Sequence, residues 1–126
     1  EPSHTLQQLP RLIAASGIDA DVAVETEVAE LSPLVSREAY RIVQESLTNA
    51  LRYGADRAAK VRITMPDDRL RVLVSNPIAV TAGPAREGRG IVGMRERVEV
   101  LGGSLTAGPA DGRWVVDAVL PVRSQP

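Results

Sequence analysis

Residues 37–54, REAYRIVQESLTNALRYG, carry the pattern that most constrains the fold of this chain. Apolar side chains recur there at the i, i+3, i+4 and i+7 spacing, which predicts a long helix with one face against a core. Ser32 and Pro33 are typical of a helix start, and Gly54 is expected to end the helix in a left-handed conformation. The apolar stripe comprises Val35, Ala39, Ile42, Val43, Leu47 and Ala50.

The opposite side of this helix is polar, and its residue types point to possible chemistry. Glu45 and Asn49 are four residues apart and are therefore neighbours on the helix surface. Their carboxylate and amide oxygens are hard ligands that can hold Mg²⁺, and Glu45 can alternatively orient or deprotonate a nucleophile. Arg52 lies one turn further along and can meet a phosphate. The alternative is an ordinary solvated helix face, on which Glu38 and Arg41 also lie.

Alternation with a period of two residues predicts strands around the helix. The first strand is expected over residues 19–28, and a β-hairpin over 60–74 with its turn at 66–68. A short helical segment, broken at Pro10 and ended near Gly17, is expected at the start of the chain.

A second helix is expected from about residue 90 to residue 101, with the charged residues 95–99 on its solvated side. Two last strands follow, separated by a turn at 109–112, and Trp114 is expected in the core. Paired strands with helices between them predict an α+β two-layer sandwich, in which helices cover one face of a mixed sheet.

Glycines gather in residues 87–94, EGRGIVGM, immediately before the second helix. Gly88, Gly90 and Gly93 fit the pattern G-x-G-x-x-G, which lets a backbone approach phosphates at a helix N-terminus. A dinucleotide-binding fingerprint would need a preceding strand in a βαβ unit, whereas a loop without periodicity precedes these glycines, so we reject that interpretation. The remaining alternative is a flexible glycine linker.

Composition excludes several classes of function. The chain has 126 residues, of which 44% are hydrophobic, so one domain with a real core is expected. A net charge of −1 argues against a dedicated nucleic-acid binder, because no strong basic field is available for phosphates. The absence of Cys excludes disulfides, thiolate catalysis and Cys-ligated zinc. His4, the only histidine, is expected to be a solvated residue of the terminal tail.

Three stretches together resemble sensor histidine kinases, in particular the NarL/DesK-like group that works with LuxR-type response regulators. EAYRIVQESLTNALRYG resembles the N box, GRGIVGMRERVEVLGGSL resembles the G2 box with its following helix, and DGRWVVDAVLP resembles the closing strand. The resemblance implies the Bergerat ATP-binding fold over residues 6–122, with an ATP lid at about 77–93. Residues 1–5 would be a linker and residues 123–126 a tail.

The resemblance also implies roles for individual residues. Asn49 matches the asparagine that holds Mg²⁺ against the ATP phosphates, and Glu45 matches the glutamate that activates the transfer or positions water. Arg52 and Tyr53 match positions beside the nucleotide, although many relatives have His where Tyr53 stands. The remaining nucleotide-binding positions implied by the match are Gly88, Gly90 and Gly93 at the hinge of the lid, Met94 after them, and Asn76.

Asn76 is the main departure from the family pattern. The family reads Asp-x-Gly-x-Gly after the hairpin, and its Asp accepts a hydrogen bond from the adenine amino group. Here the sequence is NPIAV from Asn76 to Val80, so the charge and both glycines are missing. An Asn carbonyl still accepts a hydrogen bond, but without charge assistance, so weaker adenine recognition is expected.

The function implied by the resemblance is that of a catalytic module. It would bind Mg-ATP and transfer the γ-phosphoryl group to a histidine on a separate dimerisation and phosphoacceptor domain, expected upstream of Glu1. The chain would then be a cytoplasmic, monomeric piece of a longer kinase, whose parent can be membrane-anchored and whose partner is a LuxR-type response regulator. Two alternatives stay open: a pseudokinase binding module, and another Bergerat-fold enzyme such as an anti-sigma-factor serine kinase.

Overall fold

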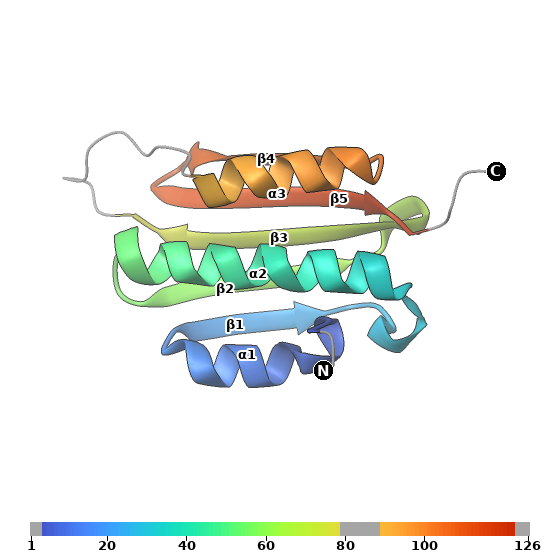
Figure 1. The fold of residues 1–126 in the computed structure, drawn as a ribbon. Helices are drawn as coiled ribbons and strands as arrows, with labels where there is room; N and C mark the ends of the chain where they lie inside the picture. The colour runs from blue at the N-terminus through green and yellow to red at the C-terminus, as the bar shows by residue number, and fades with distance from the viewer. Residues whose placement is uncertain (1–3, 79–88, 123–126) are drawn as a thin grey trace.

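A single mixed sheet forms one layer of the molecule (Figure 1). The computed structural model describes residues 4–78 and 89–122, and within them five strands lie in the order β1-β2-β3-β5-β4. β1 pairs with β2 in parallel, and the other pairings are antiparallel, which confirms the mixed sheet. The strands are β1 (Asp19–Val24), β2 (Ala58–Thr64), β3 (Arg69–Pro77), β4 (Ser104–Ala110) and β5 (Arg113–Pro121).

Helices form the second layer, and Figure 1 shows them on the same face of the sheet. This arrangement confirms the α+β two-layer sandwich. In the described residues, none of the helices has the length and hydrophobicity needed to cross a bilayer. The helices are α1 (Leu9–Ser16), α2 (Pro33–Tyr53) and α3 (Arg89–Val100), with short 3-10 turns η1 (Leu6–Gln8), η2 (Val28–Glu30) and η3 (Pro66–Asp68).

α2 begins where the sequence predicts, but the residue that ends it has a different conformation from the one expected. Ser32 Oγ accepts a hydrogen bond from the Val35 N–H at 3.3 Å, and Pro33 occupies the first turn. The expected left-handed end is wrong, because Gly54 has φ −82° and ψ 167° and is therefore extended. Glycine is needed here for space, since a Cβ on Gly54 would lie 2.6 Å from Asn76 Nδ2.

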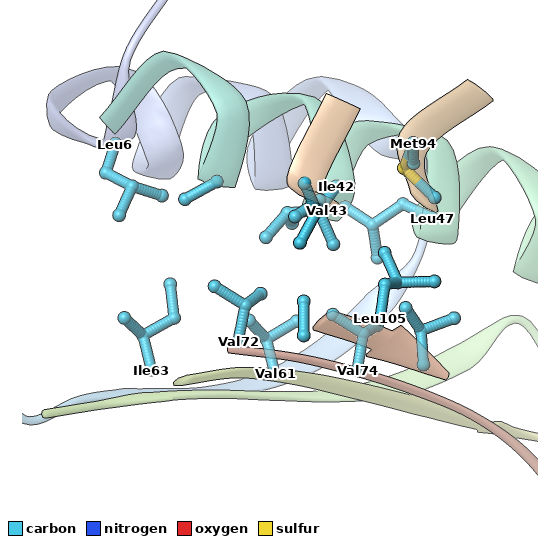
Figure 2. Packing of buried hydrophobic residues seen from close by; sticks show 14 of the residues in the cluster. Leu6, Ile42, Val43, Leu47, Val61, Ile63, Val72, Val74, Met94 and Leu105 are labelled. Carbon is cyan, nitrogen blue, oxygen red and sulfur yellow. The ribbon is translucent and has the colours of Figure 1, made fainter. Parts of the chain in front are cut away.

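The core fills the space between the two layers (Figure 2). Ile42, Val43 and Leu47 of α2 point at the sheet, and each is at most 2% exposed. Burying an aliphatic side chain of this size contributes about 1.5–3 kcal/mol. The sheet residues labelled in Figure 2 are Val61, Ile63, Val72, Val74 and Leu105.

Two strand boundaries differ from the expectation. β1 ends at Val24, not at residue 28, because its partner β2 ends at Thr64, one residue beyond the Val24–Ile63 pair. β4 continues through Pro109, which an edge strand tolerates. The turn is therefore shorter than residues 109–112 and is made by Asp111 and Gly112, both with positive φ.

Charged side chains on the far face of the sheet pair across strands. Arg62 of β2 contacts Asp21 of β1 at 2.9 Å, and Arg71 of β3 contacts Asp117 of β5 at 2.7 Å. The hydrogen bond with Asp117 raises the pKa of Arg71 above its ordinary value, and the Asp117 charge adds to this effect. This face therefore carries charged pairs, whereas the face beneath the helices carries the apolar core.

Replacement of Leu70 by alanine tests whether this residue lies in the core. Leu70→Ala should lower the free energy of unfolding by about 2–5 kcal/mol, because the side chain is fully buried. The control is Leu34→Ala, since Leu34 is 49% exposed, and its effect should stay below about 1 kcal/mol. Urea unfolding of both variants measures the difference, and equal losses would contradict the assignment.

Candidate functional site

The ends of three elements lie at one end of the sandwich, on the left of Figure 1. They are the C-terminal ends of α2 and β3 and the N-terminal end of α3. Hydrogen bonds join the first two ends. The Ala55 N–H donates to the Pro77 carbonyl oxygen at 2.9 Å, and Gly54 forms an isolated antiparallel bridge with Ile78. The parts of α2, β3 and α3 that carry residues expected in the site therefore lie at the same end of the sandwich.

Asn76 is buried at this end of the sheet. Its side chain is in the layer between sheet and helices, and the residue is 4% exposed. Asn76 Nδ2 donates to the Pro77 carbonyl oxygen at 2.9 Å, which fixes the amide plane. Asn76 Oδ1 accepts no hydrogen bond from any other described residue. The site therefore contains an oriented amide oxygen, on a largely buried residue, with accepting capacity to spare.

α2 and α3 run antiparallel, and two contacts seven residues apart fix their alignment. Gly90 of α3 lies against the carboxylate of Glu45 on α2. Two turns away, Arg97 Nε donates to Glu38 Oε1 at 2.7 Å. Seven residues advance a helix by about 10.5 Å, so the ion pair holds α3 at the axial position that places Gly90 beside Glu45.

The Glu38–Arg97 pair corrects the expectation that Glu38 is solvated, whereas Arg97 is exposed as expected although it is engaged by Glu38. Glu38 is 5% exposed and lies in the contact between the two helices. Arg95 is also engaged, because its Nε donates to the Leu105 carbonyl oxygen at 3.0 Å. The sequence alone did not reveal these contacts, because helical periodicity shows which residues share a face but not which faces meet.

The contact between Gly90 and Glu45 requires glycine. A Cβ on Gly90 would overlap both oxygens and the carboxyl carbon of Glu45, whereas a Cβ on Gly93 would meet only Arg97 Nη1 at 3.3 Å. The first turn of a helix carries unpaired N–H groups and favours negative charge. The Glu45 carboxylate therefore lies at an anion-favouring position, which is where a phosphate would also be stabilised.

The remaining expected site residues differ in their exposure to solvent. Asn49 is half-buried one turn after Glu45, whereas Arg52 and Tyr53 at the end of α2 are exposed. Met94 is 1% exposed and packs in the core near Leu47 (Figure 2), so we leave it out of the proposed nucleotide contacts.

Most of the expected lid lies outside the residues that the structure describes. Gly88 and residues 79–87 lie outside the described residues. Gly90 and Gly93, expected at the hinge of the lid, lie within α3, which begins at Arg89. The lid boundaries at 77 and 93 therefore remain predictions.

Ser46 is a polar residue of this helix that the sequence did not indicate. Ser46 is 3% exposed, and its Oγ has no hydrogen-bond partner among the described residues. A buried hydroxyl without a partner is costly, so it marks a position where a water or ligand group would be stabilised. A serine within an apolar stripe gives no sequence signal of this kind.

Comparison with known proteins gives consistent matches to one class. Sensor histidine kinase YxjM of Bacillus subtilis is 40% identical over 74 residues, which are 59% of this chain and 18% of the relative. The histidine-protein kinase/phosphatase UhpB of Salmonella typhimurium is 32% identical over 77 residues, which are 60% of this chain and 15% of the relative. No family model matches the chain.

Solved structures agree on the fold. The blue-light activated histidine kinase of Erythrobacter litoralis matches 92% of this chain and 41% of its own, with a TM-score of 0.70 and 23% identity. The catalytic domain of histidine kinase ThkA matches 95% of this chain and 90% of its own, with a TM-score of 0.66 and 17% identity. The chain is a relative of the sensor histidine kinases and has the fold of their catalytic domains.

These two sequence relatives are much longer than this chain, which spans less than a fifth of either. The expected NarL/DesK-like group is consistent with YxjM, UhpB and the further relative DegS of Bacillus subtilis. The contacts of α2 with α3 and β3 make up the candidate functional site of this chain.

Arg97→Ala tests whether the ion pair holds α2 and α3 together. The change leaves the buried Glu38 carboxylate unpaired and should cost about 1–3 kcal/mol of stability, a range reduced because Arg97 is 43% exposed. Adding Glu38→Gln should recover part of the loss, because it removes the unpaired charge.

Arg62→Ala is the matched control for Arg97→Ala, since it breaks a surface pair whose Asp21 partner is 66% exposed. Its cost should be at most about 1 kcal/mol. Chemical denaturation of each variant measures the cost. A loss in Arg97→Ala no larger than in Arg62→Ala would show that the pair does not hold α3.

Proposed function

We propose that this chain binds Mg-ATP between α2, α3 and the end of β3, and transfers the γ-phosphoryl group to a histidine on a separate dimerisation and phosphoacceptor domain. The observation that carries the proposal is the contact of Glu45 with the first turn of α3, at the same end of the sandwich as the buried Asn76. An acidic side chain, an anion-favouring helix start and the unengaged amide oxygen of Asn76 together suit a nucleotide with its metal.

Asn76 is proposed to recognise the adenine. Its Nδ2 is engaged by the Pro77 carbonyl, so Oδ1 is the group left to accept a hydrogen bond from an exocyclic amino group. The neutral amide makes this bond weaker than the charge-assisted bond of an aspartate. The neighbouring Gly54 leaves room for the amide, because any Cβ there would collide with it.

Asn49 and Glu45 of α2 are proposed to hold the magnesium ion and the phosphates of the nucleotide. Asn49 offers an amide oxygen and Glu45 a carboxylate, the hard oxygen donors that Mg²⁺ prefers, and phosphate oxygens usually supply further ligands. Mg²⁺, when bound, neutralises charge on the phosphates. Glu45 is then placed to orient or accept the proton of an attacking group, and the first turn of α3 stabilises negative charge.

Several further contacts belong to the same proposal. The exposed Arg52 lies three residues after Asn49 on α2 and is free to reach a phosphate. Tyr53 is 67% exposed, so it has surface available for a ligand. Gly88 and Gly93 are proposed to admit the phosphates closely by lacking side chains.

The partners are proposed from the relatives. All three sequence relatives are named as histidine kinases, and two are named as kinase/phosphatase proteins. We extend this to a parent protein that contains a phosphoacceptor domain and passes the phosphoryl group to a response regulator of the LuxR type. Mechanistically, the chain supplies positioning and charge stabilisation for phosphoryl transfer, with no covalent step of its own.

Asn76 favours one alternative, a binding module that holds nucleotide without transferring phosphate. Loss of the charged adenine contact is the kind of change that weakens nucleotide recognition. The parent protein incubated with γ-labelled ATP separates the two functions. Label on the parent supports the kinase, whereas nucleotide binding without label supports the binding module.

Asn49→Ala tests the metal and nucleotide assignment. The chain should bind Mg-ATP in calorimetry at millimolar nucleotide or below, and the variant should bind about tenfold more weakly. Chelating Mg²⁺ should reduce the difference between the two proteins, because Asn49 is proposed to act through the metal.

Thr48→Ala is the control for Asn49→Ala, since Thr48 is exposed on the adjacent position of α2 and should leave affinity unchanged. Two results would count against the assignment. One is an absence of binding by the unaltered chain, which would refute the nucleotide site. The other is equal affinity of Asn49→Ala and the unaltered chain in Mg²⁺, which would remove Asn49 from the metal site.

A further inference from the structure

A second concave site lies beside residues 37–44 of α2, before the part of the helix that carries Glu45 and Asn49. It is a cavity of about 250 Å³. Two separate parts of the chain line it, the segment before η1 and the outer side of α2. The lining residues are His4, Arg37, Tyr40, Arg41 and Gln44.

The His4 side of this cavity is held in place. The His4 ring stacks on Tyr40, with ring centroids 5.2 Å apart and an angle of 16° between the planes. The next residues are anchored as well, because the Leu6 N–H donates to Ser36 Oγ at 2.9 Å and Leu6 is 2% exposed. His4 is exposed, as the sequence predicts, but its ring is stacked on Tyr40 and is therefore positioned, so the cavity has two defined sides.

Within the part of the chain that the structure describes, the cavity gathers positive charge without an acidic residue in its lining. Arg37 and Arg41 are one turn apart, and neither forms an ion pair or hydrogen bond with the described residues. Like charges at this spacing destabilise a helix by about 0.2–0.5 kcal/mol. Glu38, the nearby acid on α2, is engaged by Arg97. Among residues 4–78 and 89–122, no carboxylate lines the cavity.

We infer that this cavity binds an oxyanion, a phosphate or carboxylate group, between His4 and the guanidinium groups of Arg37 and Arg41. Guanidinium groups present paired N–H donors that match both kinds of oxyanion. Gln44 adds an amide donor, and the stacked His4 and Tyr40 rings close one side. This inference is independent of the proposed nucleotide site, which uses later residues of α2.

His4 provides a direct probe, because the chain has one histidine and hence one set of imidazole resonances. The chain is titrated with inorganic phosphate at neutral pH and constant ionic strength, without nucleotide, while the His4 ring signals are recorded by NMR. We expect a saturable shift with a midpoint in the millimolar range. Arg37→Gln with Arg41→Gln should weaken the apparent affinity about tenfold or more.

The control is Arg57→Gln with Arg69→Gln, which removes the same two charges from exposed positions outside the cavity and should leave the titration unchanged. Acetate in place of phosphate distinguishes the sources: saturation by both anions assigns a general oxyanion site, and saturation by phosphate alone assigns a phosphate site. Three results would overturn the inference: a shift that does not saturate, an equal shift with chloride, or an equal loss of affinity in both double variants.

Discussion

The burial of the apolar stripe of α2 against the sheet is the interaction on which the other features depend. Ile42, Val43 and Leu47 are nearly inaccessible and face the central strands. This packing fixes the rotation of α2 about its own axis, and a helix has only one rotation that buries a given stripe. Glu45 is therefore directed away from the sheet toward α3, where its carboxylate lies against Gly90.

The second constraint is the axial alignment of α3 with α2. Core packing through Met94 brings α3 onto the sheet, but apolar contacts are non-directional and set axial position poorly. The Glu38–Arg97 hydrogen bond is directional, and the lack of a side chain on Gly90 allows close approach to Glu45. The same helix pair thus combines a structural contact with a contact proposed to be catalytic, two turns apart.

The sequence was informative wherever local patterns determine structure. It predicted the start of α2 at Ser32 and Pro33, the β2–β3 hairpin and the burial of Trp114, because capping and alternation are local effects. It failed where two elements meet. The burial of Glu38, the close approach of Gly54 to Asn76 and the His4–Tyr40 stack depend on partners that are 22 to 59 residues distant or on other elements, which periodicity does not reveal.

The central claim is that nucleotide binds between α2, α3 and the end of β3. Backbone amide NMR of the chain with Mg²⁺ and a non-hydrolysable ATP analogue tests it most directly. The account predicts saturable shifts at Asn49, Asn76 and Gly90, with little change at Arg62 and Arg71 on the far face of the sheet. Shifts confined to that far face, or no saturable shift at these three residues, would contradict it.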